Sequence, residues 1–330
     1  MPLTYIIESP AYDKNVGGFC ALHYLADRLI HLGATEVYLT TDVLNPRWKA
    51  KTINLDHPFF LGDTWLDWLY LSIGELKRYV VFNTFKRKLT RLQKRLFPKL
   101  LWRHFDIDQT VVICGEAFVG VPFEAKHVVR WIMNTPGVCG GDGIYGPNDH
   151  IFQYHPWYAV DQQYQVHGRL TVLDLDYQLK TYHNQGRPDR QGGAYLIRKG
   201  LAKTHNQHPA GFIHADPILE KMSDEEAADF FNRLQTLVSY DEMTWISVQA
   251  ALCGCQSIVI AGEGDRSAEN LKKVNRMPGI AIGWDDEAWR KSTLSELRAH
   301  LASQNQSYLQ TIPAFMQYCN SQILNPSPHP

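Results

Sequence analysis

The 330-residue chain has almost no net charge, because 33 Lys and Arg residues stand against 34 Asp and Glu residues. It therefore lacks the broad basic surface with which proteins attract nucleic acid. Its first residues, MPLTYIIESP, lack the basic start and apolar core of a secretory signal. No apolar run approaches the roughly 20 residues that a membrane-spanning helix needs. These absences predict a cytoplasmic protein that has no nucleic-acid partner.

Metal-ligand motifs are also scarce. The six cysteines are scattered, and no C-x-x-C pair has a matching second pair, so neither structural zinc nor a disulfide framework is predicted. There is no H-E-x-x-H motif. The close aspartate pairs, Asp174/Asp176 and Asp285/Asp286, have no other clear ligand nearby in the sequence. We therefore predict neither a metal site nor a cofactor.

The chain opens with a strand–helix–strand pattern. Residues 4–8 (TYIIE) and 36–41 (EVYLTT) predict two short strands. Between them, Gly17 and Gly18 precede a segment whose leucines recur at spacings of three and four, which predicts an amphipathic helix that Gly33 ends. This order of elements favours a parallel sheet.

Similar units recur along both halves of the chain. A capping box, formed by Ser223 and Glu226, marks the start of one predicted helix. The segment 127–133 (HVVRWIM) fits either a helix or a strand. Strands are predicted at 110–114, 151–155, 170–175, 194–197, 211–215 and 257–261. Helices are predicted at 224–237, from about 241 to 253, at 286–303 and at 306–324.

These patterns predict an α/β fold of two Rossmann-like domains whose parallel sheets face each other across a cleft. The first domain would cover residues 1–160 and the second 161–305, followed by a C-terminal helix and Pro-rich tail at 306–330. Because open α/β sheets bind ligands at the carboxyl ends of their strands, the candidate site residues should follow strands.

The strongest candidate segment is SYDEMTWISVQAALCGCQSIVIAGEG. A helix that began near Asp241, just after Tyr240, would direct Asp241, Thr244 and Ser247 toward the mouth of the cleft. Gln249 would lie about two turns further along. The unpaired N–H groups and positive dipole at the start of such a helix suit a diphosphate. The alternative is a core helix with an ordinary acidic first turn.

Basic and glycine-rich loops add two further candidates. Arg198 and Lys199 directly follow a predicted strand, with Lys203 nearby, and could neutralise a diphosphate. The pair Gly17-Gly18 would let a phosphate approach the start of the first helix. The alternatives are solvated surface bases and a purely conformational glycine turn.

A catalytic base is harder to identify. Transfer with inversion would need a carboxylate or a histidine to accept a proton. We select Glu116, which follows the strand at 110–114, and Asp13, with Asp142 and His155 as lesser candidates. A hydrogen-bonded loop side chain is the alternative for each of them.

The segment around Asp241 resembles the donor-binding helix of GT-B glycosyltransferases. In that family an acidic residue and a Glu, separated by seven residues, precede an Ala-rich helix end, a Gly and a Val-rich strand. Here Asp241 and Gln249 occupy the two positions. The blocks GGFCALHYLADRLIHLGATEVYLTT and GEAFVGVPFEAKHVVRWIMNTPG are similar to segments of bacterial glycosyltransferases associated with surface polysaccharide.

The resemblance implies a metal-independent glycosyltransferase with a nucleotide-sugar donor and a glycan or lipid-linked glycan acceptor. The donor would bind the second domain and the acceptor the first. Two alternatives are a nucleotide-sugar epimerase or sugar phosphorylase, and a non-catalytic GT-B-like scaffold subunit. The uncharged Gln249 favours the scaffold.

Residues 82–101 (FNTFKRKLTRLQKRLFPKLL) predict a basic amphipathic helix that Pro98 should end or kink. Such a helix can lie on an anionic membrane surface, which would place the enzyme at the inner face of the cell membrane. The alternative is a core-packing helix with a solvated basic face.

Overall fold

The computed structural model describes residues 3–41, 43–53, 69–70, 72–73, 83–200, 206–274 and 276–324. The chain divides into two compact units, each of which contains a parallel sheet covered by helices, as in Rossmann-like domains. Unit 1 comprises Met1–Leu173 and Tyr308–Pro330, and unit 2 comprises Asp174–Ser307. The C-terminal stretch, which we expected to form a separate helix and tail, is therefore grouped with the first unit.

Seven parallel strands form the sheet of unit 1, in the order β3-β2-β1-β4-β5-β6-β7. The strand order reverses between β1 and β4, which are direct neighbours. The strands are β1 (Thr4–Ile7), β2 (Glu36–Leu39), β3 (Lys51–Thr52), β4 (Thr110–Gly115), β5 (His127–Ile132), β6 (His150–Gln153) and β7 (Val166–Arg169).

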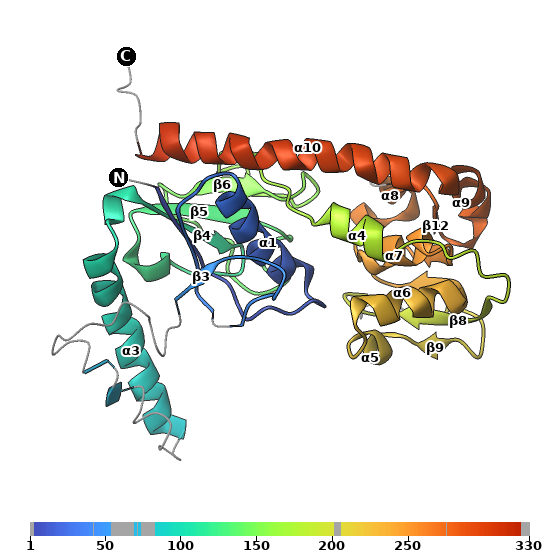
Figure 1. Cartoon of the computed structure of the whole chain (residues 1–330), viewed down its shortest axis with the longest axis horizontal. Coiled ribbons are helices and arrows are strands. Elements are labelled where there is room, and N and C mark those ends of the chain that lie inside the picture. The colour runs from blue at the N-terminus through green and yellow to red at the C-terminus, as the bar shows by residue number, and fades with distance from the viewer. Residues whose placement is uncertain are drawn as a thin grey trace. The chain divides into compact units, whose positions relative to one another are not determined.

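Alternate residues of β1 divide the core of unit 1 into two layers. Tyr5 packs in one layer with α1 (Gly17–His31) and with Phe315 of α10 (Leu297–Tyr318). Ile6 packs in the other layer with Phe97 of α3 (Asn83–His104). Figure 1 accordingly shows α1 and α3 on different sides of this sheet. The described residues contain no helix that could cross a membrane.

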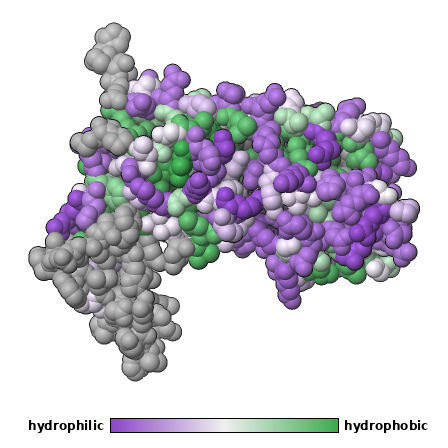
Figure 2. Space-filling view, viewed as in Figure 1, coloured by the Kyte–Doolittle hydropathy of each residue, from purple (hydrophilic) through white to green (hydrophobic). Residues whose placement is uncertain are grey.

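Five parallel strands form the sheet of unit 2, in the order β12-β11-β10-β8-β9. Here the strand order reverses between β8 and β10. The strands are β8 (Gln191–Leu196), β9 (Ile213–His214), β10 (Leu234–Ser239), β11 (Gln256–Val259) and β12 (Ile280–Ile282). The helices are α4 (Leu175–Thr181), α5 (Asp216–Leu219), α6 (Asp224–Arg233), α7 (Ile246–Leu252), α8 (Ala268–Val274), α9 (Glu287–Thr293) and the first part of α10. Hydrophilic residues dominate the face of unit 2 that Figure 2 shows.

The predicted helix at 224–237 is wrong in its second part. Helix α6 ends at Arg233, and the next six residues form the central strand β10. The apolar residues Phe231, Leu234 and Leu237 continue the helical spacing of three, so the sequence pattern does not reveal this change. The strand forms because β8 and β11 bond its backbone from both sides and bury Leu237 completely.

Three other expectations also differ from the structure. Residues 170–175 form no strand, and Asp174 instead caps α4 by accepting from the N–H of Tyr177 at 3.3 Å. The segment 286–303 divides into α9, a short 3-10 turn and the start of α10. Helix α3 continues beyond Pro98 to His104, because burial of Phe97 and its neighbours against the sheet compensates for one missing hydrogen bond.

The capping box of α6 is confirmed, and it gives a first testable expectation. The hydroxyl of Ser223 accepts from the N–H of Glu226 at 3.1 Å, while the Glu226 carboxylate accepts from the N–H of Ser223 at 2.7 Å. Ser223→Ala should lower the free energy of unfolding by about 1 kcal/mol, measured by urea denaturation. Ser303→Ala, at an exposed position of α10, is the control. Equal stability of the two variants would contradict the capping role.

Candidate functional site

The reversal of strand order in unit 2 brings two loops together. Strands β8 and β10 are parallel neighbours, with Leu196 paired to Ser239 at their carboxyl ends. The loops that follow, 197–200 and 240–242, therefore start side by side. Ligands of open α/β sheets bind at this kind of position. Of the predicted donor residues, Arg198, Lys199, Tyr240 and Asp241 are brought together here, whereas Lys203 lies outside the described residues.

Arg198 is held in a fixed position at this edge. Its backbone is left-handed, with φ of 45°, which is uncommon for a residue with a side chain. Asp216 stabilises this turn, because its Oδ2 accepts from the N–H of Ile197 at 2.7 Å and of Arg198 at 3.3 Å. Its Oδ1 lies 3.4 Å from Nε of Arg198, whose side chain is 20% exposed. The guanidinium thus forms an ion pair with Asp216 and still reaches solvent.

A histidine joins the same carboxylate. Nε2 of His214, the last residue of β9, lies 3.0 Å from Oδ2 of Asp216. The His214 ring stacks on Tyr195, with ring centroids 5.0 Å apart and an interplanar angle of 4°. Asp216 and His214 were not among the residues predicted from the sequence. Their place at the carboxyl end of the predicted strand at 211–215 was the signal that could have indicated them.

Tyr240 is held by contacts within unit 2. Its side chain is fully buried, and its hydroxyl accepts from the N–H of Gln207 at 2.8 Å and bonds to Nδ1 of His208 at 2.8 Å. Burial raises the pKa of Tyr240. Its backbone carbonyl meets the neighbouring loop at Gly200, where a Cβ would lie only 2.2 Å from the Tyr240 oxygen.

This close approach makes Gly200 sensitive to substitution. Gly200→Ala should destabilise unit 2 by about 1–3 kcal/mol, because the backbone of one loop must move away from the other. Thermal or urea unfolding measures the effect. Gly17→Ala is the control, since a Cβ there meets nothing within 4 Å. If both variants were as stable as the parent protein, the contact between the two loops would be refuted.

The rest of the predicted donor helix is arranged differently from expectation. Helix α7 starts at Ile246, so Asp241 lies in the preceding turn, buried, with Oδ1 accepting from the N–H of Met243 at 3.0 Å. Thr244 accepts from the N–H of Ile246 at 3.4 Å. The Ser247 hydroxyl is buried and has no hydrogen-bond partner among the described residues. The chain therefore forms a turn at Asp241, where the acidic residues had suggested the start of a helix.

Gln249 takes part in packing between helices. Its Nε2 donates to Oε1 of Gln178 in α4 at 2.9 Å, and the indole N–H of Trp245 donates to the same oxygen at 3.0 Å. A second carboxylate does lie near the edge of the sheet: the buried side chain of Glu242 is 3.5 Å from NH1 of Arg266. Glu242 was not among the residues predicted from the sequence, although it directly follows Asp241.

The corresponding edge of unit 1 contains the predicted base. Glu116 follows β4, is buried, and accepts from the N–H of Met133 at 3.0 Å through Oε2. Both Gly18 and Gly115 lie next to the methyl group of Met133. A Cβ added to Gly18 would be 3.9 Å from this methyl group, and a Cβ added to Gly115 would be 3.4 Å from it. The start of α1, at Gly17 and Gly18, is therefore near the ends of β4 and β5. Glu116 and the glycine pair share this part of unit 1, as the strand order requires.

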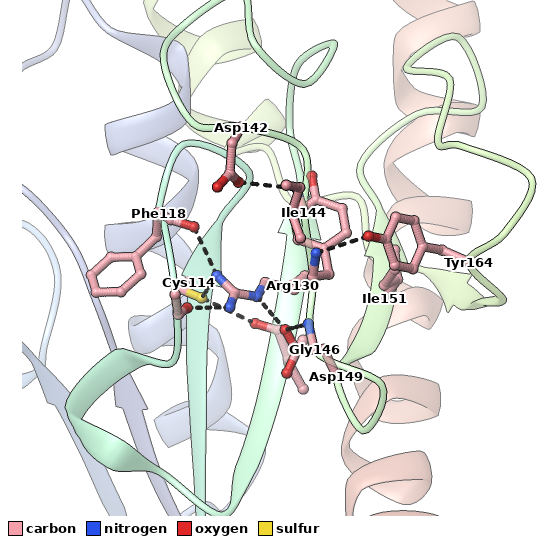
Figure 3. Close-up of polar contacts among 12 residues, drawn as sticks. Cys114, Phe118, Arg130, Asp142, Ile144, Gly146, Asp149, Ile151 and Tyr164 are labelled. Carbon is pink, nitrogen blue, oxygen red and sulfur yellow. Dashed lines mark hydrogen bonds and ion pairs between the residues drawn. The ribbon is translucent and has the colours of Figure 1, made fainter.

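The other predicted bases make local bonds. Asp13 is exposed and accepts from the N–H of Asn15 at 2.9 Å. Asp142 is exposed and accepts from the N–H of Ile144 at 3.0 Å, as Figure 3 shows. Nδ1 of His155 accepts from the N–H of Trp157 at 3.1 Å, and burial lowers the pKa of this histidine. Each forms a turn, which matches the alternative we gave for it.

A buried ion pair supports the loops beside Glu116. Nε of Arg130, in β5, donates to Oδ2 of Asp149 at 2.7 Å, and the two side chains are 1% and 6% exposed. The guanidinium also donates to the carbonyls of Phe118, at 2.9 Å, and Gly120. Figure 3 shows this network between β4, β5 and the loop before β6. Sequence analysis gave no reason to select Arg130.

Among the described residues, no group of three or more His, Cys, Asp or Glu side chains could hold a metal ion. No family model matches the chain, and no curated protein is significantly similar to it.

Proposed function

We propose that the chain is a GT-B glycosyltransferase that moves a sugar from a nucleotide-sugar donor to a glycan or lipid-linked glycan acceptor, without a metal ion or a cofactor. The observation that carries the proposal is Arg198, anchored by Asp216 at the reversal of strand order in unit 2. A partly exposed guanidinium at this position suits the diphosphate of such a donor.

Departure of the nucleoside diphosphate is the step that Arg198 would assist. The C–O bond between the sugar and the diphosphate breaks, and negative charge grows on the leaving oxygen. A guanidinium that is already in place stabilises this charge without a further reorganisation step. His214, whose Nε2 lies 3.0 Å from the same Asp216, is a second polar side chain at this position.

Glu116 is the proposed proton acceptor for the acceptor hydroxyl, at the corresponding edge of unit 1. The N–H of Met133 orients its carboxylate by donating to Oε2.

Helix α3 supports a proposed position at the inner face of the cell membrane. Arg95, Lys99 and Arg103 recur every four residues and are exposed, whereas Phe97 and Leu100 are buried. A basic stripe of this kind can attract anionic lipid headgroups. A cytoplasmic enzyme that extends a lipid-linked glycan would use such an attachment.

A non-catalytic scaffold is the second candidate, and Gln249 is the observation that favours it. This residue stands at the second acidic position of the family pattern, yet its side chain bonds to Gln178. A scaffold would not bind nucleotide sugars by itself. An epimerase or phosphorylase is distinguished from a transferase by product analysis with and without an acceptor.

A thermal-shift screen with UDP-, GDP-, dTDP-, CMP- and ADP-sugars tests the proposal. We expect one nucleotide class to raise the melting temperature, because a ligand that binds only the folded state stabilises it. Calorimetry should then give a dissociation constant for that donor. If no donor shifts the melting temperature, binds in calorimetry or is hydrolysed, the transferase proposal is rejected in favour of the scaffold.

A further inference from the structure

A cavity of about 830 Å³ lies at the amino edge of the unit 1 sheet. Its walls come from the starts of β5, β6 and β7 and from the loop segments 145–149 and 163–165. Because all strands of this sheet are parallel, the cavity is at the edge opposite to Glu116 and the start of α1. It is therefore separate from the site described above.

The loops that line the cavity are held in place by buried bonds. Asp149 accepts from Nε of Arg130 at 2.7 Å and from the N–H of Gly146 at 3.0 Å, both through Oδ2. The N–H of Tyr145 donates to the hydroxyl of Tyr164 at 3.0 Å, and the two ring centroids are 5.1 Å apart. Figure 3 shows these contacts connecting both loops to β5. A ligand would meet a largely preformed wall, which lowers the entropic cost of binding.

Two histidines from neighbouring strands form a second wall. The ring centroids of His150 and His167 are 5.1 Å apart. Nδ1 of His167 accepts from the N–H of Ile151 at 3.1 Å, which places the proton of the neutral ring on Nε2. Nδ1 of His150 bonds to the Tyr318 hydroxyl at 2.9 Å. In each ring the protein engages Nδ1, so Nε2 is the nitrogen that can bond a ligand.

The cavity is close to neutral at pH 7. Burial lowers the pKa of His167 and, with help from the nearby His167, lowers that of His150 to about 4. Both rings are therefore uncharged. The one lysine of the lining, Lys126, is paired with Asp108 outside it, and Asp149 is paired with Arg130. An anionic or cationic ligand would find no uncompensated opposite charge among these groups.

The remaining polar side chains are the His127 ring, whose pKa burial also lowers, and three neutral amides. Asn148, Gln163 and Gln165 lie at the exposed rim, and each amide can both donate and accept. The tyrosine pair adds aromatic surface beside them. Hydroxyl groups of a sugar also donate and accept, and its C–H faces pack against aromatic rings. The cavity volume falls within the range of roughly 300–1,000 Å³ that is typical of small-molecule binding sites.

We infer that this cavity binds a neutral oligosaccharide, through the Asn148 and Gln163 amides, the two histidine rings and the tyrosine pair. The site is additional to the proposed donor and acceptor positions, and its existence does not depend on the transferase activity. In a glycan-extending enzyme it would hold a part of the glycan that is not undergoing reaction.

Saturation-transfer NMR followed by calorimetry, with maltotriose, cellotriose and chitotriose as probes, tests this inference on the full chain at pH 7.5. We expect at least one trisaccharide to bind. Asn148→Ala and Gln163→Ala should each weaken its binding about fivefold, the effect of losing one hydrogen bond. Both residues lie at the exposed rim, so the fold should tolerate these changes. Gln310→Ala, at an exposed position of α10, is the matched control and should bind as the parent protein does.

Three results would overturn the inference: no binding of any trisaccharide, binding that both rim variants retain in full, or stronger binding of glucose 1-phosphate than of the neutral sugars. Thermal shifts with nucleotide sugars, measured on the same variants, separate this outcome from the proposed function. Those shifts should be unchanged in both rim variants, since neither residue belongs to the proposed donor site. Weakened trisaccharide binding together with normal donor shifts is the expected combination.

Discussion

Asp149→Ala is expected to lower the free energy of unfolding of unit 1 by about 3–5 kcal/mol. The substitution leaves the guanidinium of Arg130, which is 1% exposed, without its carboxylate partner in the interior. It also removes the acceptor for the N–H of Gly146. Urea denaturation monitored by far-ultraviolet circular dichroism measures the loss.

The chain supplies a matched control for this prediction. Lys126 and Asp108 form another ion pair in unit 1, but their side chains are 56% and 59% exposed. Asp108→Ala should lower the free energy of unfolding far less than Asp149→Ala does, because water solvates the remaining lysine. Equal losses for the two aspartate variants would show that Arg130 is not confined as the structure describes.

Arg198→Ala is expected to lower kcat/KM for sugar transfer on the order of 100-fold, as removal of one preorganised group at a leaving oxygen does in other enzymes. The comparison presupposes the proposed transferase and the donor that the screen identifies. Arg198→Lys should recover only part of the loss, because an ammonium group cannot bond the diphosphate in two places.

Arg187→Ala is the control for the arginine experiment. This residue also lies in unit 2 and pairs with Asp229. Because it precedes β8 in the chain, it lies near the amino end of that strand and away from the carboxyl ends of β8 and β10. Its loss should leave kcat/KM unchanged. A similar decrease in both variants, or none in Arg198→Ala, would remove Arg198 from the proposed reaction.

The sequence predicted the architecture better than the site. Strands with buried apolar residues, such as β4 and β11, were recognised because their side chains pack locally in a way that the pattern records. Strand β10 was missed because Phe231, Leu234 and Leu237 satisfy the helical spacing as well. Only the two neighbouring strands decide between the alternatives, and they come from distant parts of the chain.

The side-chain contacts of the candidate site cannot be read from the spacing of residues in the sequence. Arg198 could be selected because it follows a strand. Asp216, which bonds its backbone N–H, is 18 residues away and is brought there by the pairing of β9 with β8. Gln249 had the expected position in the sequence, but the helix that bears it starts at Ile246, and its amide bonds to Gln178. Local pattern identifies candidates, and tertiary packing selects among them.

The path of the chain between the two units has a consequence for folding during synthesis. Unit 2 is a continuous insertion within unit 1, whose last part begins at Tyr308. Phe315 and Cys319 complete the core layer that contains Tyr5, and Phe315 lies 4.9 Å from the ring of Phe152. The ribosome releases these residues only after all of unit 2 has been made. Unit 1 should therefore be the second unit to reach its native state, because part of one apolar face of its sheet stays uncovered until Phe315 and Cys319 have been made.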